Sequence, residues 1–146
     1  MKGYRVEIGV VVRDIEQATQ EVARLLDCPA PEIYHSDVIH GEYRGQPDEI
    51  RTCLAYFDLG GAYLKLIEEA GAPSSFTEQL DATGEGVHHI ALFVDDLPAQ
   101  EKRMEAMGIE AIQRHPSSKV DGVFWDTRAT LKTMLELVRL NKQPGA

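Results

Sequence analysis

Two adjacent histidines, His88 and His89, stand at the start of the most strand-like stretch of the chain. An imidazole can ligate a metal ion or exchange a proton near neutral pH, so the pair is a natural candidate for chemistry. Val87 to Val94 is an apolar run with β-branched residues and the length of a strand. Because side chains alternate along a strand, we expect the two rings to point to opposite faces, one of them into whatever the sheet encloses.

The residues on either side of this strand indicate how it is held. Gly84 and Gly86 mark a turn before it. After it, Asp95 or Asp96 can cap a helix whose first turn contains Pro98. The histidine strand is therefore predicted to lie between a turn and a helix start.

The same arrangement occurs earlier in the chain. Residues 6–15 align with residues 88–97 at an offset of 82, and both segments read as a strand that ends in an aspartate cap. Residues 63–67 align with residues 134–138 at an offset of 71, which pairs two further strands. Internal similarity of this kind indicates a repeated structural unit. The sequence therefore predicts one domain, residues 1–146, with module one at about residues 4–70 and module two at about residues 84–140.

Length and composition narrow the class of protein. A chain of 146 residues can bury the core of one domain, and its formal net charge of −9 argues against nucleic acid and anionic membranes as partners. No apolar stretch is long enough to cross a bilayer, and the first residues lack a signal-peptide core. The two cysteines, Cys28 and Cys53, form no CxxC pair, so neither a disulfide framework nor a zinc site is predicted. A reduced, cytoplasmic setting is expected.

The other elements are predicted from periodicity, capping signals and turn residues. Helices are expected over residues 14–26, 76–82 and 97–107. Strands are expected over residues 5–12, 50–59, 62–68, 109–114, 122–128 and 133–140. Residues 45–48 read as a turn, residues 33–45 as a polar segment with room for one short strand, and residues 115–121 as a polar loop.

Taken together, these features resemble the vicinal oxygen chelate superfamily, the glyoxalase/bleomycin resistance/dioxygenase group, and within it the methylmalonyl-CoA epimerase-like branch. The resemblance covers about residues 6–140. It is most specific in Ala72-Pro73-Ser74-Ser75-Phe76, in Gly84-Glu85-Gly86-Val87-His88-His89-Ile90-Ala91 and in Val94-Asp95-Asp96. It implies an α+β, glyoxalase-like fold, in which two tandem βαβββ modules form a curled sheet around one central cavity.

The resemblance also implies a metal site in that cavity, made by two residues of each module. By position these are Glu7 and Lys65 in module one, and His89 and Glu136 in module two. His89 and Glu136 are usual at their positions, and Glu7 can ligate through oxygen where His or Gln is usual. Lys65 stands where Glu or Gln is usual, and its ammonium has three donors and no lone pair.

Lys65 separates two forms of this site. Deprotonating it costs roughly 4–5 kcal/mol at neutral pH, and leaving it charged about 4 Å from a divalent ion costs roughly 8 kcal/mol at an effective dielectric of about 20. Either effect lowers metal affinity by several powers of ten. We therefore expect no cofactor, with Lys65 in the place of the metal. A divalent metal held by Glu7, His89 and Glu136 is the alternative.

The function that the resemblance favours is that of an isomerase, lyase or epimerase acting on a small carbonyl compound or acyl-CoA thioester. Removal of a proton beside the carbonyl gives an enolate, which needs a base and a group that holds the oxyanion. Glu136 is the predicted base and Glu7 the runner-up, while Lys65, assisted by His89, is predicted to hold the oxyanion. All four residues are therefore catalytic candidates.

Other functions remain open from the sequence. The chain can be a binding protein that sequesters a ligand in an apolar cavity lined by Tyr56, Phe57, Trp125 and Met134, with the polar quartet as a structural ion-pair network. It can also be a domain that only assembles. The expected partners are a small molecule and a second copy of the chain in a homodimer.

The remaining histidines have simpler interpretations. His88 is expected to pack on the opposite face of its strand or to be half exposed. His35, His40 and His115 fall in polar segments, and we interpret them as surface residues.

Overall fold

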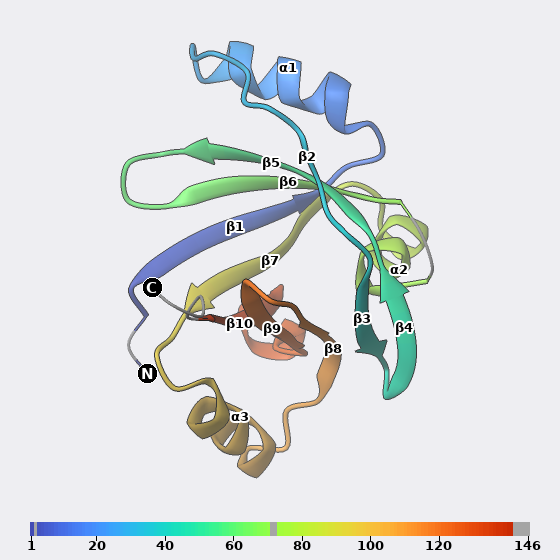
Figure 1. Cartoon of the computed structure of the whole chain (residues 1–146), viewed down its shortest axis with the longest axis vertical. Coiled ribbons are helices and arrows are strands. Elements are labelled where there is room, and N and C mark those ends of the chain that lie inside the picture. Colours follow the sequence, from blue (N-terminus) through green and yellow to red (C-terminus); the bar gives the residue numbers. More distant parts are fainter. Residues whose placement is uncertain (2, 71–72, 142–146) are drawn as a thin grey trace.

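The computed structural model describes residues 1, 3–70 and 73–141, and its architecture is α+β (Figure 1). Ala72, the first residue of the motif noted above, lies outside the described residues. In chain order the elements are β1 (Arg5–Val11), α1 (Ile15–Leu25), β2 (Tyr34–His35), β3 (Ile39–Tyr43), β4 (Gln46–Ile50), β5 (Thr52–Asp58), β6 (Tyr63–Glu69), α2 (Ser75–Ala82), β7 (Gly86–Phe93), α3 (Leu97–Ala106), β8 (Ala111–Pro116), β9 (Val120–Trp125), α4 (Arg128–Leu131) and β10 (Met134–Leu140).

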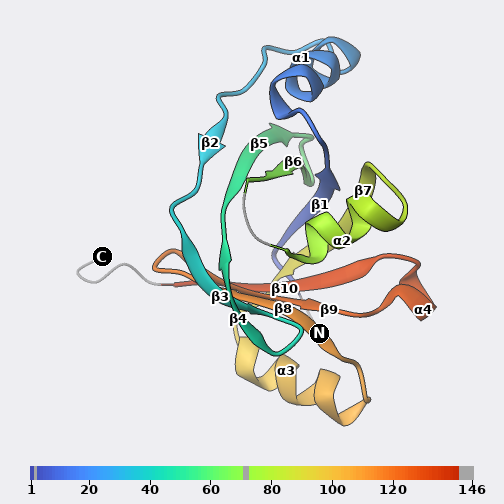
Figure 2. The same ribbon diagram turned by 90° about the vertical axis from the view of Figure 1, so that its right-hand side faces the viewer.

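All the strands join one sheet, in the order β2-β5-β6-β1-β7-β10-β9-β8-β3-β4. The two halves of the chain meet where β1 and β7 pair antiparallel. In each half the first strand pairs in parallel with the last, β1 with β6 and β7 with β10. The sheet curls, as Figure 2 shows, and the predicted α+β class and curled sheet are confirmed.

The helices α1 and α3 occupy equivalent places in the two halves, on the outside of the sheet at opposite ends of the molecule (Figures 1 and 2). Asp14 caps α1 and Asp96 caps α3, each accepting a backbone N–H at 3.1 Å. Apolar residues of α1 pack on β5 and β6, and those of α3 pack on β9 and β10. In the described part of the chain, none of the helices has the length and apolarity that crossing a membrane requires.

The hairpin of β3 and β4 breaks the similarity between the halves. It belongs to the first half of the chain, yet β3 pairs with β8 of the second half. The turn lies at Arg44 and Gly45, with φ of 49° and 77°, rather than at the predicted residues 45–48. The prediction was wrong because Pro47 was read as a turn residue. Since β4 is the outermost strand of the sheet, the missing N–H of a proline removes no essential ladder bond.

Two boundaries in the second half also differ from prediction. β8 continues to Pro116, so His115 lies in a strand and not in the predicted polar loop. β9 begins earlier and ends at Trp125, and the single turn of α4 takes up Arg128, which was predicted to be in the strand. Lys132 ends that turn with φ of 64°, a left-handed conformation that reverses the chain into β10.

Candidate active site

The four residues predicted for the site lie on four consecutive strands of the sheet, β6, β1, β7 and β10. The strand register places their side chains on one face, because Gly9 pairs with both Lys65 and His89, while Ala91 pairs with Glu7 and Glu136. All four residues are buried. Lys65 Nζ lies 3.5 Å from Glu7 Oε1 and 3.9 Å from Glu136 Oε2. The structure thus brings the predicted quartet together, with the amine of Lys65 between two carboxylates.

The charges of this cluster support one another. Burial alone would lower the pKa of Lys65, but Glu136, Tyr56 and Glu7 outweigh it and hold that pKa above its usual value. Burial would raise the pKa of Glu136, but Lys65, His115 and His89 hold it well below its usual value. At neutral pH Lys65 is therefore an ammonium and Glu136 a carboxylate.

Arg5 completes the charge balance and was missed from the sequence. Its Nη2 lies 2.8 Å from Glu7 Oε2, and its guanidinium lies over the rings of Tyr63 and Phe93, with centroid distances of 4.1 and 5.1 Å. Both oxygens of Glu7 are thereby engaged by cations. The two cations Arg5 and Lys65 match the two anions Glu7 and Glu136. Strand alternation contained the signal, since Arg5 precedes Glu7 by two positions and shares its face.

His115 is the second residue that sequence reasoning missed. Its Nε2 lies 2.8 Å from Glu136 Oε1, and its side chain is only 14% exposed, so its interpretation as a surface residue was wrong. The error followed from ending the predicted strand at Arg114. Opposite His115 stands Gly122, where an added Cβ would lie 2.2 Å from His115 Nε2 and 2.7 Å from Glu136 Oε1. A side chain at position 122 would therefore displace the contact between His115 and Glu136.

The two adjacent histidines point to the same side of the sheet, contrary to the prediction. The pairing of β1 with β7 shifts after Gly9, which pairs with His89, while Val10 pairs with Val87. His88 is thus the extra residue of a β-bulge, and a bulge interrupts the alternation of side chains. Both rings contact Phe124, and their Nδ1 atoms lie 2.8 Å apart. His88 does pack, as expected, but it is fully buried.

Both imidazoles are neutral at physiological pH. Burial, followed by the neighbouring His89, lowers the pKa of His88 to about 3, against a smaller opposing effect of the Ser75 backbone. Burial also lowers the pKa of His89, although Glu136 opposes this shift. His89 Nε2 lies 3.1 Å from Glu136 Oε2. Each carboxylate oxygen of Glu136 thus faces one histidine.

Tyr56 is the most exposed group beside the cluster. It pairs with Lys65 across the hairpin of β5 and β6, and 36% of it is exposed. Burial raises the pKa of its phenol, so it remains an O–H donor at neutral pH. Phe57 and Trp125, which the binding hypothesis placed in the same cavity, face the other side of the sheet and pack beneath α1 and α3. That part of the prediction was wrong.

The residues at this site do not fit a divalent cation. His89 Nε2 and Glu136 Oε2 are as close as two neighbouring ligands would be. Glu7, however, has both oxygens bound to positive groups, and the ammonium of Lys65 lies where it would repel a metal ion. Among residues 1, 3–70 and 73–141, no three His, Cys, Asp or Glu side chains are grouped to hold a metal ion.

The fold is that of a glyoxalase-like protein. The chain belongs to the glyoxalase/bleomycin resistance protein/dioxygenase superfamily, whose family model matches residues 7–125. It is 30% identical over 93 residues to the uncharacterized protein YqjC of Bacillus subtilis, a match that spans 62% of this chain and 66%, just under two thirds, of that protein.

Solved structures agree on the fold. The hypothetical protein BH1468 from Bacillus halodurans superimposes with a TM-score of 0.69, at 18% identity and 98% coverage of both chains. A methylmalonyl-CoA epimerase in complex with methylmalonyl-CoA and NH4+ gives a TM-score of 0.66, at 23% identity, with 95% of this chain and 96% of that chain covered. The glyoxalase-like fold predicted from the sequence is confirmed, and methylmalonyl-CoA epimerases are among the solved structures that share it, consistent with the suspected branch.

Proposed function

We propose that this protein is an isomerase or lyase that transfers a proton at the carbon beside a carbonyl, in a small carbonyl compound or an acyl-CoA thioester. The observation that supports this most directly is the ammonium of Lys65, 3.5 and 3.9 Å from two carboxylates. It stands at a position where the resemblance to the superfamily implies a metal ligand. In this proposal the protein uses no metal, and the ammonium supplies the positive charge.

Lys65 holds the oxygen that becomes negative. Loss of the proton converts the carbonyl into an enolate, and its oxygen is stabilised by donors already in place. The ammonium of Lys65 is such a donor, and the phenol of Tyr56 lies on the same face beside it. Burial strengthens both interactions, because charges act more strongly where water is excluded.

We assign the role of base to His115 rather than to Glu136, the residue favoured from the sequence. Both oxygens of Glu136 face histidines, and a carboxyl with so low a pKa is a weak base. Glu7, the runner-up, has each oxygen bound to a cation. If His115 donates its Nε2 hydrogen to Glu136, Nδ1 is left as the basic nitrogen. Glu136 then orients the ring and stabilises the imidazolium that forms.

The comparisons support an acyl-CoA thioester as the substrate class. Methylmalonyl-CoA epimerases are among the solved structures that share this fold. One of them was solved with methylmalonyl-CoA and NH4+.

The test is exchange of the substrate α-proton with solvent deuterium, followed by proton NMR with methylmalonyl-CoA and propionyl-CoA as probes. We expect exchange by the wild type and a loss of about 100-fold or more in Lys65→Met, the usual effect of removing an oxyanion donor. His115→Gln should lose about 100- to 10,000-fold. His40→Gln, which changes an exposed histidine away from the cluster, is the matched control.

Two results would reject the proposal. Exchange that survives Lys65→Met and His115→Gln unchanged would remove both residues from the chemistry. Absence of exchange with either thioester would favour the second candidate, a non-catalytic ligand-binding protein. The balance of two cations, Lys65 and the partly exposed Arg5, against two buried anions supports that candidate, because structural ion networks are neutral in the same way. Ligand binding would then persist in Lys65→Met.

A further inference from the structure

A pocket whose lining includes His88 but none of the charge cluster lies elsewhere on the sheet. It has a volume of about 220 Å³ and is bounded by α2, β7 and the segment from α4 into β10. Its apolar lining consists of Val87, Ile112 and Met134. None of the four residues of the charge cluster lines it. The chemistry proposed above therefore does not account for this pocket.

Two polar atoms of this pocket have no partner. Ser75 Oγ and His88 Nε2 are buried, with 2% and 1% of their residues exposed, and neither forms a hydrogen bond. The Ser75 backbone lies close to the His88 ring but does not engage Nε2 in a hydrogen bond of regular geometry. Leaving a buried polar group unpaired costs about 1–3 kcal/mol, so two such groups on one pocket indicate a missing partner.

The histidine pair determines what His88 offers to this pocket. Glu136 is ionised and its Oε2 lies 3.1 Å from His89 Nε2, so electrostatics favour the tautomer of His89 that carries its hydrogen on Nε2, although this contact lacks the geometry of a regular hydrogen bond. A neutral imidazole carries one ring hydrogen, so Nδ1 of His89 is then an acceptor. His88 must donate its own Nδ1 hydrogen across the 2.8 Å contact. His88 Nε2 is thus left with a lone pair, and it faces the pocket as an acceptor.

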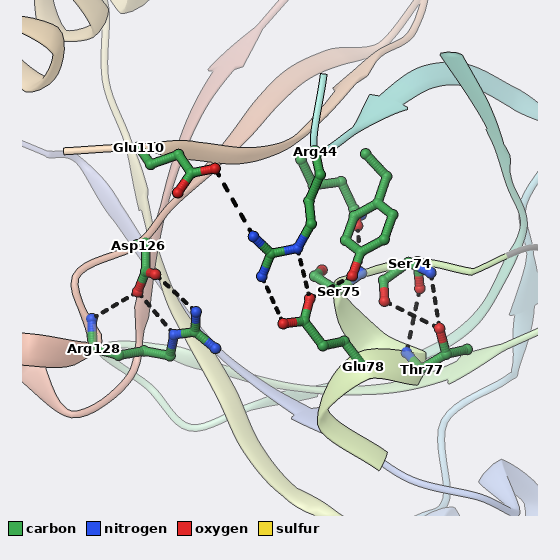
Figure 3. Close-up of polar contacts among 10 residues, drawn as sticks. Arg44, Ser74, Ser75, Thr77, Glu78, Glu110, Asp126 and Arg128 are labelled. Carbon is green, nitrogen blue, oxygen red and sulfur yellow. Dashed lines mark hydrogen bonds and ion pairs between the residues drawn. The ribbon is translucent and has the colours of Figure 1, made fainter. Parts of the chain in front are cut away.

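The charged residues at the rim of the pocket are paired, as Figure 3 shows for Glu78 and Arg128. Glu78 accepts from Arg44 at 2.6 Å and also from the hydroxyl of Tyr43. Arg128 donates to both oxygens of Asp126, at 2.8 and 2.7 Å. Lys132 donates to the carbonyl of Ala129. With these charges engaged, the pocket suits an uncharged molecule better than an ion.

We infer that this pocket is a second small-molecule site, which binds an uncharged molecule with a hydroxyl group and a short apolar body. The hydroxyl donates to His88 Nε2 and accepts from Ser75 Oγ, while the apolar body contacts Ile112 and Met134. The volume suits a body of about the size of a six-membered ring. The inference rests on one part of the proposed function, the presence of Lys65 rather than a metal ion beside Glu136.

The test is a titration followed by two-dimensional ¹H–¹⁵N NMR, with cyclohexanol, cyclohexanone and cyclohexanecarboxylate as probes of one shape. We expect cyclohexanol to give saturable shifts at the backbone amides of Ser75, His88 and Thr133, which line the pocket. Cyclohexanone cannot donate, so it should bind at least about fivefold more weakly. The carboxylate should be weaker still, because the lone pair of His88 repels it.

Two variants locate the binding. Ser75→Ala and His88→Phe should each lower cyclohexanol affinity about five- to tenfold, the effect of one lost hydrogen bond. Phenylalanine keeps a ring between Phe76 and Phe124, and Ser75→Ala decides alone if His88→Phe does not fold. Thr83→Ala is the matched control, since Thr83 also lines the pocket but its hydroxyl is already bonded to the Gln79 carbonyl. Its affinity should stay within about twofold of wild type.

Two outcomes would overturn the inference. The absence of saturable shifts with cyclohexanol would show that the pocket takes solvent only. A preference for cyclohexanone would show that His88 Nε2 carries a hydrogen, the arrangement expected if His89 Nε2 bound a cation. Binding is measured without turnover, so a failure of deuterium exchange with cyclohexanol binding intact would reject the proposed enzyme and leave this site standing.

Discussion

The two halves of the molecule place different chemistry at equivalent positions. Glu7 of the first half aligns with His89 of the second, and Lys65 aligns with Glu136. The first half adds Arg5 to its pair, whereas the second half places His88 and His115 beside its pair. Arg5, Glu7 and Lys65 together carry one positive charge, and Glu136 supplies the matching negative charge. The two halves have equivalent strand positions but carry different side chains there, and the charges of these side chains are complementary.

The substitution that should disturb this charge complementarity most is Lys65→Met. Removing the cation leaves Glu136 without its buried counter-ion, and breaking a buried pair in this way costs about 3–5 kcal/mol. We expect that loss in the free energy of unfolding, measured by urea denaturation. Lys102→Met, on the exposed face of α3, is the control and should change stability by less than about 0.5 kcal/mol. A loss below about 1 kcal/mol in Lys65→Met would show that the halves do not depend on this charge.

A second substitution makes the halves more alike. Lys65→Glu places a carboxylate where the second half already has one. The site then holds three carboxylates together with His89. We expect this variant to bind Mn²⁺ and to be stabilised by about 3 kcal/mol at 100 times its dissociation constant. Thermal unfolding with and without Mn²⁺, after treatment with EDTA, measures the effect. Equal stabilisation of the wild type would contradict the conclusion that its residues do not fit a metal ion.

The two halves should also lose their contributions to the free energy of unfolding at opposite ends of the pH scale. The pKa of His88 is lowered to about 3, so its contribution to stability is complete above the unfolded pKa of about 6.5 and is lost as the pH falls. The loss for this ring is about 2 kcal/mol between pH 6.5 and pH 5. The pKa of Lys65 is raised, so its contribution is complete below about pH 10.4 and is lost at higher pH.

Urea denaturation across the pH range measures both effects. His88→Phe should flatten the acid side of the profile and leave the alkaline side unchanged. Lys65→Met should flatten the alkaline side of the profile instead. Identical acid slopes in the wild type and in His88→Phe would contradict this prediction. They would show that the burial of His88 beside His89, Phe76 and Phe124 does not determine the loss of stability at low pH.

The smallest expected effect is that of Arg5→Met. The Arg5 side chain is 35% exposed, and partly exposed ion pairs contribute about 1 kcal/mol or less. We expect a loss of that order in urea denaturation, which 1 M NaCl should reduce further. A loss as large as that of Lys65→Met would mean that Arg5, and not Lys65, balances Glu7.

Local patterns predicted the features that repeat. The strand and cap signals of residues 6–15 and 88–97 appear in the sequence twice. The resemblance to the vicinal oxygen chelate superfamily, and not the repeat alone, pointed to Glu7, Lys65, His89 and Glu136. The direction of His88 could not be predicted in this way. A bulge adds one residue to one strand, and only the register against Gly9 and Val10 reveals it.

Contacts between strands that are distant along the chain could not be predicted from local sequence patterns. His115 joins the site because β8 extends by two residues beyond the predicted strand, and strand ends are poorly defined by local propensity. The pairing of Tyr43 with Gln113 is set by the curvature of the sheet, which no local pattern records. Arg5 is the exception, since alternation within β1 was sufficient to place it beside Glu7.

The hairpin of β3 and β4 has a consequence for the way this chain acquires its structure. Because a segment of the first half completes the sheet edge of the second, the first half cannot be finished until residues 111–116 have been made and ordered. Contacts so distant along the chain slow folding, since a long loop must close before they form. We expect one cooperative refolding phase in the range of milliseconds to seconds, with no separately stable intermediate from either repeat.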